Sequence, residues 1–91
     1  MPTESTATLT LMWEAKAAPG QGSALLDWAR AQELSPAPFR REHFTAPGER
    51  VLVITWWEGG GDDHNAAVPE LPPPPSELIA RPVHRWRFTR V

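Results

Sequence analysis

The chain has 91 residues, a length that fits one compact α+β domain over residues 1–91. Nine basic and eleven acidic residues give a net charge of −2, which argues against nucleic-acid binding, and no apolar run is long enough to span a membrane. The sequence has no cysteine, which excludes disulfides, thiolate metal sites and a cysteine nucleophile, and is compatible with the cytoplasmic location that we expect.

The N-terminal third predicts a strand followed by an amphipathic helix. Residues 1–7 are polar and are expected to fray. Residues 8–16 alternate in polarity, with one apolar face made of Leu9, Leu11, Trp13 and Ala15. After a Pro-Gly turn, Ser23 offers an N-cap hydroxyl to a helix over residues 23–34. The proline-rich segment that follows is expected to end this helix.

The middle of the sequence predicts a β-hairpin whose second strand is apolar on both faces. Residues 39–46 and 50–58 read as its strands, and Pro47-Gly48 reads as the turn. Side chains alternate along a strand, so Val51, Val53 and Trp57 face one way and Leu52, Ile54 and Trp56 the other. Such a strand must be covered on two sides, and one helix covers only one. We therefore predict a homodimer that packs through its sheet faces.

The C-terminal third predicts a loop, a proline-rich crossover and a last strand. Residues 59–75 form the loop and crossover, and the three glycines at 59–61 could let residues 59–65 act as a lid. Residues 76–81 predict one or two helical turns. Residues 84–91 alternate, and we expect His84, Trp86 and Phe88 to face inward and Arg85, Arg87 and Thr89 to face outward.

Together these elements predict a ferredoxin-like, four-stranded antiparallel sheet in the order 4-1-3-2, with one main helix and a short second helix. The first and third strands are the most apolar and are expected at the centre. The second and fourth carry several arginines, which suit sheet edges because charge discourages further strand pairing.

The order of elements resembles the dimeric α+β barrel superfamily, in particular the antibiotic-biosynthesis-monooxygenase-like domains. Three segments carry the resemblance: TLTLMWEAKAAPGQGSALLDWA, FRREHFTAPGERVLVITWWE and HRWRFTRV. The resemblance implies a dimeric α+β barrel. Known members include cofactor-independent quinol monooxygenases, haem-degrading enzymes, isomerases and stress-response proteins, so the fold alone does not select an activity.

Two departures from the family pattern narrow the choice. Members usually carry a longer second helix, whereas the prolines before residue 76 leave room only for a short one. Haem-degrading members use an asparagine on the first strand and a histidine on the second helix. Residues 9–15 contain no asparagine and residues 76–81 no histidine, so haem degradation is disfavoured, and we expect no cofactor.

His43 and His84 are the candidate catalytic residues, because a histidine beside aromatic rings could act as a base near neutral pH. If residue 45 pairs with residue 50, His43 lies opposite Leu52 on the face of Trp56. Either histidine could equally be a core or interface residue with a satisfied hydrogen bond.

Aromatic side chains could line a pocket for a small flat ligand, and the candidates are Trp13, Trp28, Trp56, Trp86 and Phe88. Trp57 could join them. The alternative, which we favour, is that the tryptophans fill the core and the subunit interface.

Three further features have structural interpretations that outweigh functional ones. Residues 62–65 contain ligand-type side chains, but their spacing matches no metal motif, so we predict no metal site. Arg85, Arg87 and Arg90 could bind an anion, although edge protection and ion pairs with Glu14, Glu42 or Glu58 explain them. The prolines at 72–75 could bind an SH3-like groove, but a stiff crossover is simpler.

Two functions therefore remain open. The first is a dimeric α+β barrel that binds, and could oxidise, a flat organic substrate without a cofactor. The second is a non-catalytic dimeric module with a stress-response or accessory role. An enclosed cavity that touches a histidine would favour the first, and a solidly packed core would favour the second.

Overall fold

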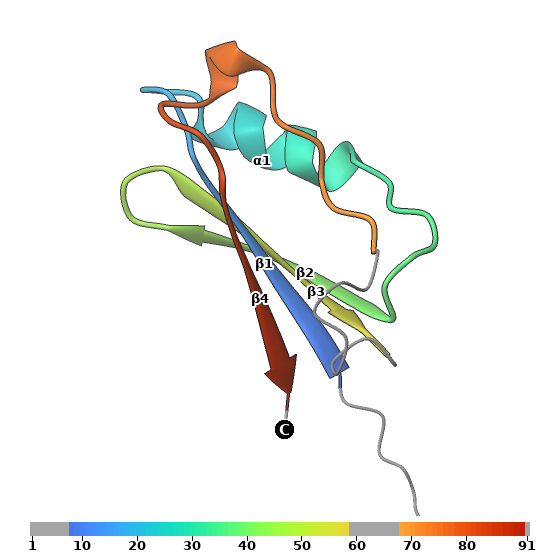
Figure 1. Ribbon diagram of the computed structural model, residues 1–91. Helices are drawn as coiled ribbons and strands as arrows, with labels where there is room; N and C mark the ends of the chain where they lie inside the picture. Colours follow the sequence, from blue (N-terminus) through green and yellow to red (C-terminus); the bar gives the residue numbers. More distant parts are fainter. Residues whose placement is uncertain (1–7, 59–67, 91) are drawn as a thin grey trace, which may run out of the picture.

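Four antiparallel strands form one open sheet, with a single α-helix on one of its faces (Figure 1). The computed structural model describes residues 8–58 and 68–90. Along the chain the elements are β1 (Thr8–Lys16), α1 (Gly22–Ala31), β2 (Arg40–Ala46), β3 (Arg50–Trp57), the 3₁₀ turn η1 (Ser76–Leu78) and β4 (His84–Arg90). No helix within these described ranges is long and apolar enough to cross a membrane.

The sheet order is β2-β3-β1-β4, which reads 4-1-3-2 from the opposite edge. The two most apolar strands, β1 and β3, are therefore central, and the arginine-bearing strands β2 and β4 form the edges. This α+β arrangement is compatible with a ferredoxin-like sheet. The single chain leaves the sheet open, so the dimeric barrel stays a prediction.

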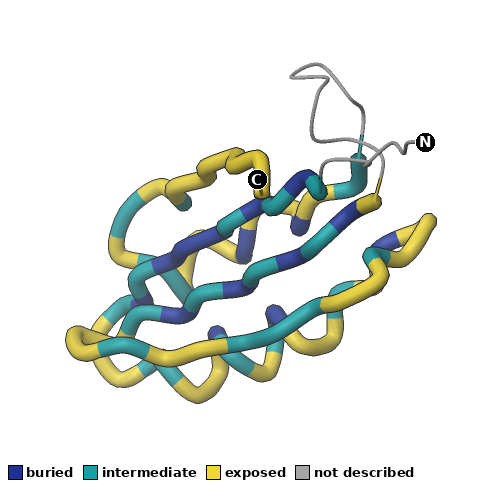
Figure 2. Tube along the Cα trace, turned by 90° about the horizontal axis from the view of Figure 1, so that it is seen from below, coloured by how far each residue is buried: buried dark blue, intermediate teal, exposed yellow. Residues whose placement is uncertain are grey.

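The core lies between the sheet and α1. Along β3, Val51, Val53, Thr55 and Trp57 are buried, and the residues between them are half-buried on the opposite face. Figure 2 shows the same alternation of dark blue and teal along β3. The predicted alternation of this strand is thus confirmed. From α1, Leu25 and Ala29 are fully buried within the core cluster.

Both ends of α1 differ from the sequence prediction. The helix begins at Gly22, and its N-cap residue, Gln21, makes no side-chain capping bond, so the prediction of Ser23 as cap was wrong. The carboxylate of Glu49, from the hairpin turn, instead accepts hydrogen bonds from the backbone N–H groups of Gly20 and Gly22, each at 3.0 Å. These two bonds hold the pKa of Glu49 below its usual value.

The C-terminus of α1 is satisfied by a side chain from another strand. The helix ends at Ala31, three residues before the predicted end, and Gln32 is already extended. The guanidinium of Arg41, on β2, donates to the carbonyl oxygens of Ala29 and Gln32, each at 2.7 Å. The Ala29 carbonyl also accepts the backbone N–H of Gln32 at 3.2 Å, so Arg41 is its second donor, and Arg41 supplies a donor for the Gln32 carbonyl as well. Long-range partners therefore set both helix boundaries.

The predicted hairpin register was wrong by one residue. The turn has three residues, and its last two adopt positive φ, 83° at Gly48 and 58° at Glu49, so that Ala46 pairs with Arg50 and His43 with Val53. A shift of one residue moves a side chain to the other face of the sheet. His43 consequently lies on the α1 side with Val53, and not on the side of Trp56.

The predicted second helix is reduced to the single 3₁₀ turn η1, which follows the proline-rich crossover. The side chains of β4 alternate as predicted, but the two faces are exchanged: the face expected to point inward points away from α1. Trp86 pairs with Met12 on the face away from α1, where Trp86 and Phe88 are 43% and 48% exposed. Arg85 and Arg87 pair with Trp13 and Leu11 on the α1 side. Arg85 and Arg87 therefore lie on the helix-facing side of the sheet, and not on the outer side as expected.

Candidate functional site: a cavity on the helix side of the sheet

A cavity of about 280 Å³ lies between the α1 side of the sheet and the crossover that precedes η1. Its floor is two rows of the sheet that run across β3, β1 and β4: Thr55, Leu11 and Arg87 in one row, and Val53, Trp13 and Arg85 in the next. Leu34, after α1, and Pro69, Glu70 and Leu71, from the crossover, enclose it, and Met12 and Trp86 complete the lining.

Trp13 is the most informative residue of this lining. Its side chain is buried, at 4% exposure, and its ring stacks on Trp28 with 6.1 Å between ring centroids. The indole Nε1–H finds no hydrogen-bond acceptor in the described part of the chain. A buried donor without an acceptor costs free energy, and such groups are rare in folded proteins. Trp13 lines the cavity, but its Nε1 has almost no accessible surface and is buried away from the cavity space.

The β4 edge of the cavity carries a charged group of three residues. Glu70 accepts an ion pair from Arg85 Nε at 3.1 Å and one from Arg87 Nη2 at 3.6 Å. Arg85 Nη2 also donates to the carbonyl oxygen of Leu71 at 3.1 Å. Two guanidinium groups therefore share one carboxylate and hold the crossover against the sheet. From the sequence we expected these arginines to form ion pairs with Glu14, Glu42 or Glu58, and Glu70 was not identified as their partner.

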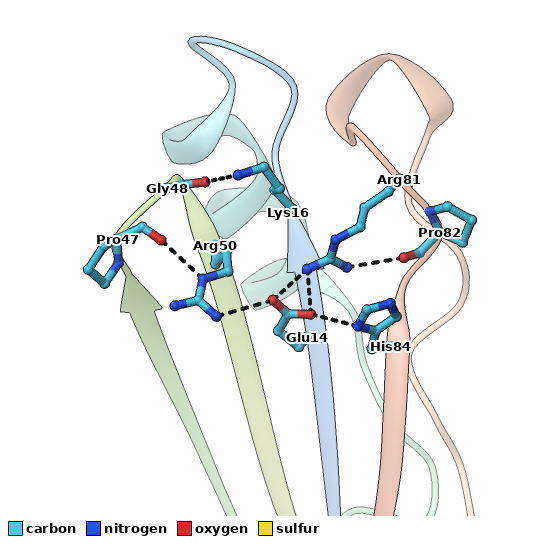
Figure 3. Close-up of polar contacts among 8 residues, drawn as sticks. All are labelled: Glu14, Lys16, Pro47, Gly48, Arg50, Arg81, Pro82 and His84. Carbon is cyan, nitrogen blue, oxygen red and sulfur yellow. Dashed lines mark hydrogen bonds and ion pairs between the residues drawn. The ribbon is translucent and has the colours of Figure 1, made fainter.

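The opposite face of the sheet carries a second polar cluster, centred on the buried carboxylate of Glu14 (Figure 3). Arg81 Nη2 donates to both of its oxygens, at 2.9 and 2.7 Å. Arg50 lies 3.7 Å away, and His84 Nδ1 lies 3.4 Å away. The cluster ties β1, β3 and β4 to the segment after η1. Its carboxylate is already fully engaged, which makes the cluster a structural one.

The two candidate catalytic histidines lie on opposite faces of the sheet, and neither lines the cavity. His43 accepts a hydrogen bond at Nε2 from Arg41 Nε at 3.2 Å. Burial, followed by the positive charges of Arg41 and Arg30, lowers the pKa of His43. His84 contacts Glu14 and meets Trp86 edge to face.

The five candidate ligand-binding residues are also divided between the faces. Trp13 lines the cavity and Trp28 supports it from α1. Trp86 also borders the cavity, but its side chain lies on the opposite face of the sheet. Trp56 lies on the open face, where the guanidinium of Arg40 sits 5.0 Å from its ring centroid. Phe88 is exposed on the same face. Only part of the predicted aromatic set is therefore brought to one site.

Residues 8–58 and 68–90 hold no group of three or more histidine, aspartate or glutamate residues placed to bind a metal ion. The metal-type residues at 62–65 and the proposed lid at 59–65 lie outside the described residues.

No protein-family model matches this chain, and neither the curated proteins nor the solved structures include a significant match to it. The resemblance to the dimeric α+β barrel superfamily therefore stays a prediction.

Proposed function

We propose that this chain binds a small flat organic ligand in the helix-side cavity. The observation that carries the proposal is the lining of this cavity, which combines the ring of Trp13 and aliphatic side chains with the charged groups of Glu70, Arg85 and Arg87 at one edge. Ligand sites are typically concave and apolar with a few polar groups, and about 300 Å³ is the lower end of their usual volume. The cavity, at about 280 Å³, suits a ligand of one or two rings.

Cofactor-independent oxygenation is the finer form of this proposal, and it requires a base beside the bound substrate. His43 and His84 do not line the cavity, whereas Glu70 does. The geometry therefore supports binding more strongly than histidine-assisted oxidation. The position of both histidines outside the cavity also favours the second candidate function, a non-catalytic binding or accessory module. Oxygen uptake with a quinol substrate would favour the enzyme, and binding without turnover would favour the module.

We also propose that the protein is a homodimer that packs through the open face of the sheet, as in a dimeric α+β barrel. Leu52, Ile54 and Trp56 are only half-buried there, and Trp86 and Phe88 are largely exposed. Apolar area of this kind commonly marks an interface. Sedimentation should give a dimer, and Phe88→Asp should shift it towards monomer. A wild-type protein that stays monomeric at micromolar concentration would contradict the proposal.

The cavity can be tested by filling it. Leu34→Trp adds bulk at the cavity wall, and Ala24→Trp adds the same ring at an exposed position of α1 as a control. We expect the wild type and Ala24→Trp to bind the neutral probe 1-naphthamide, measured by calorimetry, and Leu34→Trp to lose at least tenfold in affinity. Equal binding by all three proteins would place the probe elsewhere and contradict the proposed site.

A further inference from the structure

We infer that crossover residues 68–75 form a strap that closes the cavity, and that Arg85 is the latch that holds this strap against the sheet. A ligand then enters and leaves when the latch releases at the β4 edge. This inference rests on the proposed function and specifies how access to that same site is controlled.

The strap is stiff and packs along one edge. Proline occupies positions 69 and 72–75, and because proline fixes φ and has no N–H to donate, the segment favours an extended polyproline helix. Leu71 and Pro74 are buried, and the prolines between and after them are exposed. This spacing of burial matches the three residues per turn of such a helix. The strap is therefore expected to move as one unit.

The downstream end of the strap is fixed away from the cavity. After the prolines, the carbonyl oxygen of Leu78 accepts the backbone N–H of Ala18 at 2.9 Å, and the N–H of Ala80 donates to the carbonyl oxygen of Lys16 at 2.8 Å. Neither pair lines the cavity. The strap can thus leave the cavity while its attachment to the end of β1 remains.

The part of the strap that lines the cavity, Pro69 to Leu71, is held from β4 by polar contacts. Arg85 contacts two successive residues of this wall: its Nε pairs with the carboxylate of Glu70 at 3.1 Å, and its Nη2 donates to the carbonyl oxygen of Leu71 at 3.1 Å. Arg87 contacts the same carboxylate at 3.6 Å. The side chains of Arg85 and Glu70 are 38% and 37% exposed, and ion pairs this accessible to solvent are weak. Such a latch can break and re-form while the rest of the fold stays intact.

A latch and a direct ligand contact have different kinetic signatures. If the strap opens to admit a ligand and closes again over it, a weaker latch raises the association and dissociation rate constants by the same factor and leaves Kd nearly unchanged. If Glu70 instead contacts the ligand, its loss raises mainly the dissociation rate constant, and the affinity falls with it.

The experiment measures both rate constants for 1-naphthamide by stopped-flow fluorescence. Glu70→Gln removes the charge that the latch engages, and we expect both rate constants to rise about threefold, the scale of one exposed ion pair. Arg85→Gln also removes the bond to Leu71 and should have the larger effect. Adding Glu70→Gln to Arg85→Gln should then change the rate constants less than adding it to the wild type. Glu77→Gln, at an exposed glutamate of η1, is the matched control and should keep the wild-type values.

The outcomes separate this inference from the function on which it rests. Binding of 1-naphthamide with rate constants that neither Glu70→Gln nor Arg85→Gln changes would overturn the strap and leave cavity binding intact. A rise in the dissociation rate constant alone would overturn it as well. A wild-type protein that does not bind 1-naphthamide would overturn the proposed function and the strap together. Because Glu70 is exposed, Glu70→Gln is expected to fold even if Arg85→Gln does not.

Discussion

The two faces of the sheet bury their residues by different means. On the α1 side, the odd-numbered residues of β1 and β3, all apolar except Thr55, form a buried layer with Leu25 and Ala29. The open side also carries the carboxylate of Glu14, which is 5% exposed, pairs with Arg50 and Arg81 and is contacted by His84. Because neighbouring residues of a strand point to opposite faces, β1 takes part in both.

This difference indicates how each face responds to change. The helix face depends on apolar area and close packing, so its residues should be sensitive to truncation in a single chain. The open face depends on one paired carboxylate and on whatever covers its apolar residues. The adjacent residues Trp56 and Trp57 lie on opposite faces and provide a direct comparison.

The largest effect is expected at Trp57. This ring is buried, and its Nε1 donates to Thr55 Oγ1 at 3.0 Å. Trp57→Ala should lower the free energy of unfolding by about 3–5 kcal/mol, measured by urea denaturation. Trp56→Ala should cost less than half as much at low protein concentration, because that ring is only half-buried.

The same pair tests the proposed dimer. If a second copy covers the open face, the cost of Trp56→Ala should grow with protein concentration, while that of Trp57→Ala should change less. Equal costs for the two variants at the lowest concentration would show that the faces are not assigned correctly.

An intermediate effect is expected at Glu14. Replacing its carboxylate with the amide of Glu14→Gln keeps the shape but removes the charge that Arg81, Arg50 and His84 share. Unfolding free energy should fall by about 2–3 kcal/mol, the usual range for hydrogen bonds to a charged group. Glu33→Gln, at an exposed position beyond α1, should stay within about 0.5 kcal/mol of wild type. A Glu14→Gln protein as stable as this control would show that the cluster contributes nothing.

The smallest effect is expected from His43 and should appear only as a pH dependence. Its pKa is lowered in the folded chain, so the fold favours the neutral imidazole that accepts the Arg41 hydrogen bond. The stability that this provides is present above the usual value of 6.5 and is lost as pH falls towards the folded pKa.

His43→Gln should therefore lose less stability than wild type when thermal unfolding is followed from neutral to mildly acidic pH. Thr45→Ser, a change on the same strand and face that does not titrate, should keep the wild-type slope. Identical slopes for all three proteins would rule out His43 as a contributor.

Much of the fold could be predicted from local pattern. The alternation in residues 8–16 and 50–58 predicted two central strands within one residue of their observed limits, and the arginines marked the two edge strands. The Pro-Gly pair predicted the hairpin turn. These features follow from side-chain periodicity and turn chemistry, which act over a few neighbouring residues.

The candidate site could be predicted only in part. Of the residues predicted to bind a ligand, Trp13 lines the cavity on the helix side, whereas the side chain of Trp86 lies on the opposite face. Neither predicted histidine lines the cavity. His43 was assigned to the wrong face because the sequence does not reveal whether the turn uses three or four residues. Glu70 was missed because a single acidic residue in a proline-rich crossover has no local signal of its role.

The sequence by itself determined where strands form, which of them suit the centre of a sheet and that β3 is apolar on both faces, since these depend on neighbouring side chains. Tertiary structure decided the register of the hairpin, the closure of both helix ends by Glu49 and Arg41, and the meeting of Trp13, Arg85 and Glu70 around one cavity. Those contacts join residues far apart along the chain, and they exist only once the sheet has brought the strands together.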